Sequence, residues 1–380
     1  MSASTRSIPV CTPLLDGNEE RYVAEAVRGG WISSVGPAVG EFERRFAAWC
    51  GTTHGVSVSN GTAALHLALT ALDVGPGDEV VLPDFAMVAV LFAVLYRGAT
   101  PVLVDVEPDT WNLDPNALAH AVSPRTKAII AVHTYGHPCD MDAIGAIAAG
   151  AGAAVVEDAA EAHGAEWHGR RAGSLGAIAT FSFYANKIVT TGEGGMVVTT
   201  DSRLAERCRY FRNLCFPLDR PRDYFHQDVG FNYRLTNLQA ALGLAQMERA
   251  EALVEARRRN ARAYAAALRH IPGLSLPVER AGAKNVYWMF GVTIDAQTFG
   301  RSRDELARAL ADRGVETRPF FQPIHEQPPY LRACGGRAER AFPVSTRLAA
   351  EGLYLPSGPG LAEDDIAYVG AAIRDAARRG

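Results

Sequence analysis

The stretch Phe181-Ser-Phe-Tyr-Ala-Asn-Lys187-Ile-Val-Thr-Thr-Gly-Glu-Gly-Gly195 decides the fold of this chain. It continues an apolar run that begins at Ile178 and predicts a strand, and the run 196–200 that follows it predicts a second strand. Between the two, the chain turns through Lys187 into a glycine-rich corner, where glycine permits tight turns and close approach of the backbone to another group. We therefore expect Lys187 at the edge of a sheet, with its amine directed into a cleft.

An acidic residue upstream gives this lysine a chemical context. The apolar run Val155-Val-Glu-Asp158 ends on an aspartate followed by small residues, 29 positions before Lys187. Pyridoxal phosphate (PLP) chemistry requires a lysine that forms a Schiff base and an acid that keeps a ring nitrogen protonated. A lone lysine is more often a solvated surface charge, so the argument depends on the pair.

A third element precedes both. The segment Val58-Ser-Asn60-Gly61-Thr62 leads directly into a strong helical pattern, and a helix N-terminus of this kind suits an anion. Taken alone, Asn-Gly-Thr is equally well explained as a cap and turn. Together with an aspartate and a lysine at strand ends, it predicts a site for a phosphorylated cofactor.

With these residues the chain resembles the DegT/DnrJ/EryC1/StrS family of sugar aminotransferases, which are PLP enzymes of the aspartate aminotransferase-like (type I) fold. The resemblance runs nearly end to end, and within the family it is strongest to the GDP-perosamine synthases. The segments that carry it are Leu15-Asp-Gly-Asn18, Trp31-Ile-Ser-Ser-Val-Gly36, Glu157-Asp-Ala-Ala-Glu-Ala162, Thr191-Gly-Glu-Gly-Gly-Met196 and Gly230-Phe-Asn-Tyr-Arg234.

The resemblance implies an activity. Such an enzyme moves an amino group from L-glutamate to a nucleotide-linked keto-deoxysugar, with pyridoxamine 5'-phosphate as the intermediate form of the cofactor. The substrate implied first is GDP-4-keto-6-deoxy-D-mannose, which would yield GDP-perosamine. The alternative is amination at C3 or C4 of another nucleotide-ketosugar, linked to dTDP or UDP, for an antibiotic or a polysaccharide.

The resemblance also implies site residues. Lys187 and Asp158 are the catalytic pair: Lys187 carries the cofactor and moves protons, and Asp158 holds the ring nitrogen protonated. The other cofactor-binding positions are Asn60, Gly61, Thr62, Met87, Glu161, Ser182 and Asn232, and the substrate-binding positions are Trp31, Ser33, Arg318 and His325. From the residues alone, the loop at 31–34 is equally well explained as a connection between helices. In the same way, Asn232 could be a turn residue and Arg318 the partner in a surface ion pair.

One of these positions implies an assembly. In the family, the asparagine that matches Asn232 reaches the cofactor phosphate of the neighbouring subunit. We therefore expect an obligate homodimer with a shared active site.

Two positions depart from the family pattern. Where relatives stack an aromatic ring on the cofactor, this chain places Met87, or Phe85 if the register is shifted; a thioether can also lie against a π face. Further along, Phe92 is bulkier than the residues usual there and is expected to reshape the sugar pocket.

The order of patterns predicts the architecture. Apolar runs at 79–82, 101–105, 127–132, 153–156, 179–182 and 196–199 alternate with helical stretches, which is typical of an α/β fold with a largely parallel sheet covered on both faces. We expect a large PLP-binding domain over residues 1–260 and a small C-terminal α+β domain over 261–380. The latter contains a strand at 285–294, a helix at 302–314 and a proline-rich irregular loop at 317–330.

Composition argues against several classes of protein. The chain of 380 residues has a formal net charge of -4 and a pI near 6.2, which argues against non-specific nucleic-acid binding. Its six cysteines form no Cys-x-x-Cys pair, so neither a metal site nor a disulfide framework is expected. Without a signal core or an apolar stretch of membrane-spanning length, it is expected to be a cytoplasmic enzyme that contacts no membrane.

Two further alternatives are disfavoured. Some members of this fold replace the lysine by histidine and act as PLP-dependent sugar dehydratases, but this chain retains Lys187. A non-catalytic sensor of cofactor or sugar is the other class, and the chain carries no appended DNA-binding module.

Overall fold

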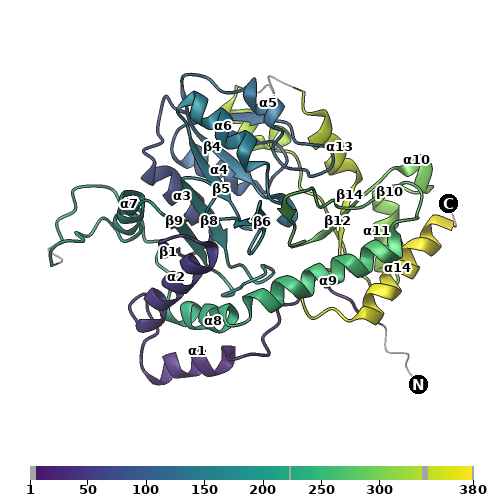
Figure 1. The fold of residues 1–380 in the computed structure, drawn as a ribbon, viewed down its shortest axis with the longest axis horizontal. Helices are drawn as coiled ribbons and strands as arrows, with labels where there is room; N and C mark the ends of the chain where they lie inside the picture. Colours follow the sequence, from purple (N-terminus) through teal and green to yellow (C-terminus); the bar gives the residue numbers. More distant parts are fainter. Residues whose placement is uncertain (1–5, 222–223, 336–340, 379–380) are drawn as a thin grey trace.

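The main sheet of the computed structural model, which describes residues 6–221, 224–335 and 341–378, has the strand order β1-β9-β8-β5-β4-β2-β3 (Figure 1). Among its described strands β9 alone is reversed, because both of its neighbours pair with it antiparallel whereas the other pairs are parallel. This confirms the largely parallel sheet. In chain order the strands are β1 (His54–Val58), β2 (Glu79–Pro83), β3 (Thr100–Val104), β4 (Thr126–Val132), β5 (Ala154–Asp158), β8 (Ile178–Ser182) and β9 (Gly195–Thr199).

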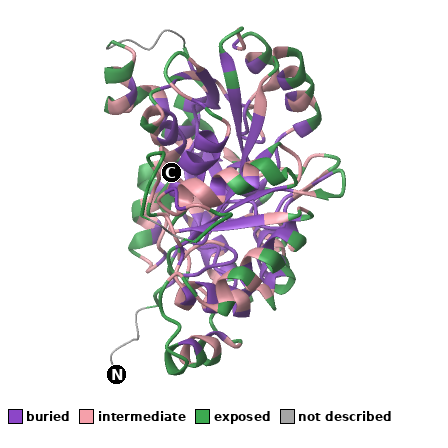
Figure 2. Cartoon of the chain, turned by 90° about the vertical axis from the view of Figure 1, so that its left-hand side faces the viewer, coloured by how far each residue is buried: buried purple, intermediate pink, exposed green. Residues whose placement is uncertain are grey.

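Helices cover both faces of this sheet because its strands are apolar on both sides. On one face lie α3 (Gly61–Ala71), α4 (Ala89–Tyr96) and α7 (Ser202–Arg212). On the other lie α2 (Pro37–Cys50), α5 (Pro115–Ala119) and α6 (Met141–Ala151), with Phe46 of α2 4.9 Å from the ring of Phe181 on β8. Figure 2 shows the result: buried residues fill the strands and the exposed ones gather on the outer helices.

The long helical region after residue 234 is interrupted rather than continuous. It consists of α8 (Asn237–Met247), against which α1 (Glu19–Arg28) packs, and α9 (Ala250–Leu268). Figure 1 shows α9 running from α8 to the far side of the molecule. The expected domain boundary at 260/261 falls inside this helix, and the division into two domains stays a prediction. No helix in the described ranges is both long and apolar enough to cross a membrane.

A second, antiparallel sheet lies at the other end of α9. Its order is β10 (Leu274–Ser275), β12 (Phe290–Ile294), β14 (Gly352–Leu355) and β13 (Arg318–Pro319), and it packs against α9, α11 (Arg303–Ala311) and α14 (Glu363–Arg378). The remaining described elements are β6 (Glu166–Trp167), β7 (Arg170–Arg171), β11 (Ala283–Lys284), α10 (Ala296–Phe299), α13 (Pro343–Glu351) and the 3-10 turns at Thr134–Gly136 and Ile324–Glu326.

Two local predictions were wrong. The strand expected over 285–294 begins only at Phe290, because Tyr287 has a left-handed backbone with φ of 48° that ends any extended run before it. The loop expected over 317–330 ends in a helix, α12 (Pro328–Ala333). Pro328 and Pro329 start this helix because the first turn leaves its N–H groups without intrahelical partners, so proline loses nothing there.

Candidate active site

The carboxyl ends of the parallel strands meet at one edge of the main sheet. Because β1, β5 and β8 run in the same direction, the start of α3, the end of β5 and the end of β8 lie at this edge, as open parallel sheets require of a ligand site. A cavity of about 370 Å³ opens there. Predicted residues that line it are Asn60, Gly61, Thr62, Met87, Asp158, Glu161, Ser182 and Lys187.

Lys187 projects into this cavity from the turn that follows β8. Its backbone N–H donates to the carbonyl of Tyr184 at 2.8 Å, which closes the turn. Its Nζ lies 3.6 Å from the ring centroid of Trp288 and 4.0 Å from Glu161 Oε1. Burial lowers the pKa of the Lys187 amine, and the two nearby carboxylates oppose that shift. A lowered pKa favours the neutral amine that acts as nucleophile and base.

The chain contains two other lysines, and neither is in such surroundings. Lys127 is exposed on β4, and Lys284 forms an ion pair with Glu166 at 2.7 Å. Of the three, Lys187 alone lines the cavity.

Two buried carboxyl groups lie beside the lysine. Asp158, the last residue of β5, accepts from the backbone N–H of Ala160 at 3.1 Å, and burial raises its pKa. Glu161 accepts from the backbone N–H of Tyr135 at 2.8 Å, and burial raises the pKa of Glu161 to about 7. A cationic ring nitrogen placed against Asp158 would offset its desolvation and keep it ionised.

The start of α3 forms a cradle at the other end of the cavity. Asn60 caps the helix by accepting from the backbone N–H of Ala63 at 2.8 Å. A Cβ atom on Gly61 would lie 2.8 Å from Cβ of Ser182, so glycine is what lets the helix start approach β8 this closely. The helix N-terminus and the hydroxyls of Thr62 and Ser182 therefore suit a phosphate group.

The same cavity has an unpaired acceptor. Oδ1 of Asn186, which lines it, is buried without a hydrogen-bond partner. The unpaired oxygen of Asn186, the phosphate cradle, Asp158 and Lys187 are together the groups that PLP requires, so the residues present fit this cofactor.

The two candidates for contact with the ring lie in different surroundings. Met87 lines the cavity and is 50% exposed, whereas Phe85 is fully buried in the core against Phe320 and Tyr135. Phe92 does not line the cavity; its ring packs 6.4 Å from that of Tyr96 on α4. Within one chain, the expected reshaping of the pocket by Phe92 is therefore not observed.

Three predicted residues lie on exposed segments away from the cavity. Asn232 is exposed and forms an isolated bridge with Asn213. Trp31 is 49% exposed, and its carbonyl, like that of Ser33, accepts a hydrogen bond from Asn237. A single chain does not bring these three side chains to the Lys187 amine.

Two others are each held by an acidic residue: Arg318 by Glu316 beside the second sheet, and His325 by Asp84, directly after β2 of the main sheet. Arg318 on β13 forms an ion pair with Glu316 and lies beside Tyr354 of β14, which lines the cavity. His325 is fixed by the buried Asp84, which accepts from its Nδ1 at 2.7 Å and from its backbone N–H at 2.8 Å. The structure thus places Arg318 one strand away from the cavity and gives His325 a structural partner.

Sequence reasoning missed part of the lining. Trp288, Phe321 and Tyr354 close the cavity from the side of the second sheet. Each comes from a segment more than 90 residues after Lys187, and nothing local in the sequence distinguishes it from a core aromatic.

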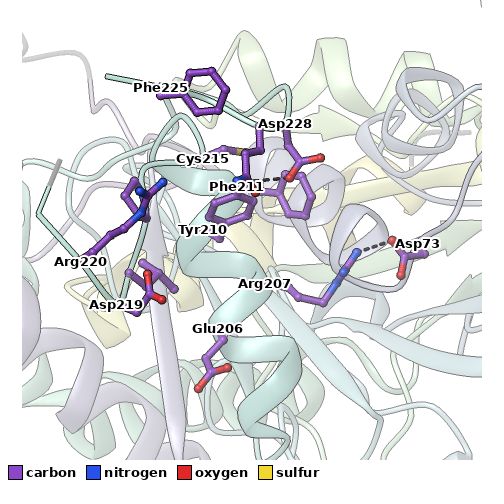
Figure 3. Close-up of a pocket in the computed structure, with 13 residues that line it drawn as sticks. Asp73, Glu206, Arg207, Tyr210, Phe211, Cys215, Asp219, Arg220, Phe225 and Asp228 are labelled. Carbon is purple, nitrogen blue, oxygen red and sulfur yellow. Dashed lines mark hydrogen bonds and ion pairs between the residues drawn. The ribbon is translucent and has the colours of Figure 1, made fainter. Parts of the chain in front are cut away.

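A second, larger hollow of about 710 Å³ lies between α7 and the segment that follows it (Figure 3). Arg207 pairs with Asp73 there, and the hydroxyl of Tyr210 donates to Asp228 at 2.9 Å. None of the predicted site residues lines it. Arg207 and Asp73 are paired with each other, and none of the three lysines of the chain lines this hollow.

Comparison with known proteins gives this geometry a family. The DegT/DnrJ/EryC1/StrS aminotransferase family matches residues 13–374. The chain belongs to this family. It is a PLP-dependent sugar aminotransferase of the α/β type I fold.

Individual relatives are similar over nearly their whole length. GDP-perosamine synthase of Caulobacter vibrioides is 45% identical over 96% of this chain and 97% of that protein. The structure of DesV of S. venezuelae in complex with a ketimine intermediate aligns with a TM-score of 0.88 at 38% identity, covering 96% of this chain and 95% of that one. DesI, solved in the presence of its TDP-sugar product, aligns with a TM-score of 0.91 at 36% identity, covering 100% of this chain and 95% of that one.

Proposed function

We propose that this family member transfers the amino group of L-glutamate to the keto group of GDP-4-keto-6-deoxy-D-mannose and so produces GDP-perosamine. The observation that carries the transamination is the convergence of Lys187, Asp158 and the start of α3 on one buried cavity. Lysine, carboxylate and phosphate cradle are what such a cofactor needs, and the family membership supplies the reaction class.

Six residues of the cavity have a role in this proposal. PLP would supply an electron sink when bound. Lys187 would hold the cofactor and, with its neutral amine, would carry a proton between substrate and cofactor. Asp158 would face the ring nitrogen and keep it protonated, Gly61, Thr62 and Ser182 would hold the phosphate, and Met87 would contact the ring.

The choice of sugar rests on similarity. The Caulobacter enzyme named GDP-perosamine synthase is 45% identical to this chain from end to end. The second candidate, a dTDP-linked ketosugar, is favoured by the likeness to DesI, whose structure was solved with a TDP-sugar. We propose Trp31 and Ser33 as sugar contacts and Arg318 as a contact for the donor carboxylate or the nucleotide. His325 would act there through Nε2, because its Nδ1 is held by Asp84.

The position of Asn232 supports a homodimer with shared sites. It is exposed, forms an isolated bridge with Asn213 directly after α7, and does not line the cavity of its own chain. The segment between Asn213 and Asn232 projects beyond α7 (Figure 1). That segment exposes Leu218, Tyr224, Phe225 and Val229 by 54% to 86%, a concentration of apolar surface that a partner chain would cover. We propose that Asn232 completes the phosphate site of the partner.

A single assay tests the substrate. The purified full chain, loaded with PLP, is incubated with L-glutamate and GDP-4-keto-6-deoxy-D-mannose, and the products are followed by mass spectrometry. Loss of the ketosugar, appearance of the amino sugar and release of 2-oxoglutarate in equal amounts are expected. The dTDP-linked ketosugar serves as the matched competitor.

The outcomes separate the levels of the proposal. If glutamate yields 2-oxoglutarate once per cofactor but the GDP-sugar remains unchanged, the aminotransferase stands and the sugar is wrong. Preferred turnover of the dTDP-sugar would favour the second candidate. Complete absence of 2-oxoglutarate would reject glutamate as the donor.

A further inference from the structure

Arg257, near the middle of α9, is a buried arginine without a carboxylate partner. It is 1% exposed, and no acidic oxygen among the described residues lies within ion-pair distance of it. Its guanidinium donates to the carbonyls of Trp288, Ser357 (2.9 Å) and Asn186 (3.1 Å) and lies 3.5 Å from Sγ of Cys11. Its Nε has no partner.

Such an arrangement is costly for folding. A permanently charged group removed from water needs a counter-ion or a full set of hydrogen bonds, and apolar residues usually replace buried charges without loss. Arg257 has no counter-ion and one unsatisfied donor. Its presence at this buried position therefore points to a task that an apolar residue cannot perform.

The contacts of Arg257 converge on the lysine. Asn186 immediately precedes Lys187, and Trp288 supplies the ring face that lies 3.6 Å from Lys187 Nζ. Nε1 of Trp288 also donates to the carbonyl of Asn186, at 2.9 Å. One guanidinium therefore fixes both the turn that presents Lys187 and the aromatic surface on which its amine rests.

The charge of Arg257 acts on the same group. A cation buried beside an amine disfavours the ammonium form, because little water is present to screen the repulsion. The pKa of Lys187 is lowered by burial first, and the charge of Arg257 adds to that shift while Glu161 and Asp158 oppose it.

We propose that Arg257 is a positioning residue for Lys187: it holds together the turn that presents Lys187 and the Trp288 ring on which its amine rests, and it places a positive charge near that amine. The inference deepens the proposed function, because it rests on Lys187 being the lysine that carries the cofactor. Arg257 itself touches neither substrate nor cofactor.

The test is the pH at which Lys187 becomes reactive. The full chain, freed of cofactor, is acetylated at a series of pH values, and modification of each lysine is measured by peptide mass spectrometry. The three lysines make the pattern simple, and exposed Lys127 is the internal reference. In Arg257→Gln we expect the midpoint of Lys187 labelling to rise by about one pH unit, the size of shift that one nearby buried charge produces.

Arg258 provides the matched control. It lies on the same helix and also donates to a backbone carbonyl, that of Asn285, and to the carboxylate of Glu279. Arg258→Gln removes comparable bonds away from the cavity, so the Lys187 midpoint should not move. An unchanged midpoint in Arg257→Gln, or an equal shift in Arg258→Gln, overturns the proposal.

Arg257→Lys keeps the test decisive where Arg257→Gln does not fold. Lysine retains the charge but cannot reach all of the carbonyls that the guanidinium bridges. We expect the midpoint of Lys187 labelling in this variant to stay within about half a pH unit of the wild-type midpoint. In the cofactor-loaded enzyme, kcat should fall by a larger factor than KM rises. A larger shift in the midpoint overturns the electrostatic role.

Failure of the proposed function is distinguishable from failure of this inference. Borohydride reduction of the loaded wild-type chain fixes the cofactor to its lysine, and the modified peptide identifies which one. Attachment to Lys127 or Lys284 would reject the proposed role of Lys187, whatever the midpoints show. Attachment to Lys187 with unmoved midpoints would reject the role of Arg257 alone.

Discussion

The sheet edge and the exposed segments of this chain differ in how complete they are. At the sheet edge, Asp158 and Glu161 are buried, Lys187 is partly buried, and all three converge on one cavity with the start of α3. Trp31 and Asn232 lie on exposed segments that do not reach this cavity. The difference is that one chain brings Lys187, Asp158 and the start of α3 together, whereas the role proposed for Asn232, at the cofactor phosphate, requires a partner chain.

Removal of the Lys187 amine is the strongest test of the cavity at the sheet edge, which a single chain forms. Lys187→Ala should reduce turnover by about 10³-fold or more, because it removes both the nucleophile and the proton carrier. Stopped-flow absorbance with L-glutamate measures the donor half-reaction directly. The fold should persist, since the change removes a polar amine that lines a cavity rather than a packed apolar group. Full turnover in a folded Lys187→Ala would end the assignment.

Mixed dimers test whether Asn232 contributes to the phosphate site of the partner chain. Asn232→Ala alone should weaken phosphate binding and reduce activity by about 10-fold, the cost of one lost hydrogen bond to a charged group. Mixing it with Lys187→Ala chains should restore about a quarter of the wild-type sites, since each mixed dimer pairs an intact Lys187 with an intact Asn232.

The matched control for this experiment mixes two single variants whose changes lie in the same cavity. Lys187→Ala mixed with Asp158→Asn should restore nothing, because both residues line the same cavity of a single chain. No recovery in the mixture of Asn232→Ala with Lys187→Ala, beyond the average of the two separate variants, would show that Asn232 acts within its own chain.

Trp31, in the loop at 31–34, should give a smaller effect, one that changes the use of the nucleotide-sugar but not the use of glutamate. Trp31→Ala should raise KM for the nucleotide-sugar by about 5-fold, through loss of an aromatic contact, and leave the glutamate half-reaction unchanged. Steady-state kinetics with the sugar varied, compared with single-turnover absorbance with glutamate alone, provide the two values. An effect on both halves would place Trp31 in a general structural role.

The buried carboxyl group provides the smallest effect, a dependence of stability on pH. The pKa of Glu161 is raised from 4.5 to about 7 by burial, so between these values the folded chain holds a proton that the unfolded chain releases. Unfolding is therefore favoured as pH rises through this window. In cofactor-free protein, Tm of Glu161→Gln relative to wild type should increase from pH 5 to pH 8. A constant difference would mean that Glu161 titrates near its ordinary value.

Local patterns predicted the sheet edge because its residues are consecutive with the strands they terminate. Asp158 ends an apolar run, and Lys187 follows another, so hydrophobic periodicity alone locates both. The cap at Asn60 was equally visible, since Asn-Gly-Thr before a helical pattern satisfies the exposed N–H groups of the first turn.

The remaining lining could not be predicted in this way. Trp288 and Tyr354 reach the cavity only because the second sheet packs beside the first, a long-range arrangement that no local pattern encodes. Within that region, Tyr287 adopts a left-handed backbone that its sequence neighbours do not announce. The prolines at 328 and 329 indicate a loop by their residue type, although proline serves equally well in the first turn of a helix.

The unbroken course of α9 constrains how the enzyme can move. Its 19 residues form a rod of about 28 Å that joins the two sheets, and Arg257 anchors the middle of this rod beside the lysine. Swinging one sheet away from the other about residue 260 would break successive backbone hydrogen bonds of the helix. Admission of a bulky nucleotide is thus a matter for the loops around the mouth of the cavity, while the two sheets behave as a single stiff frame.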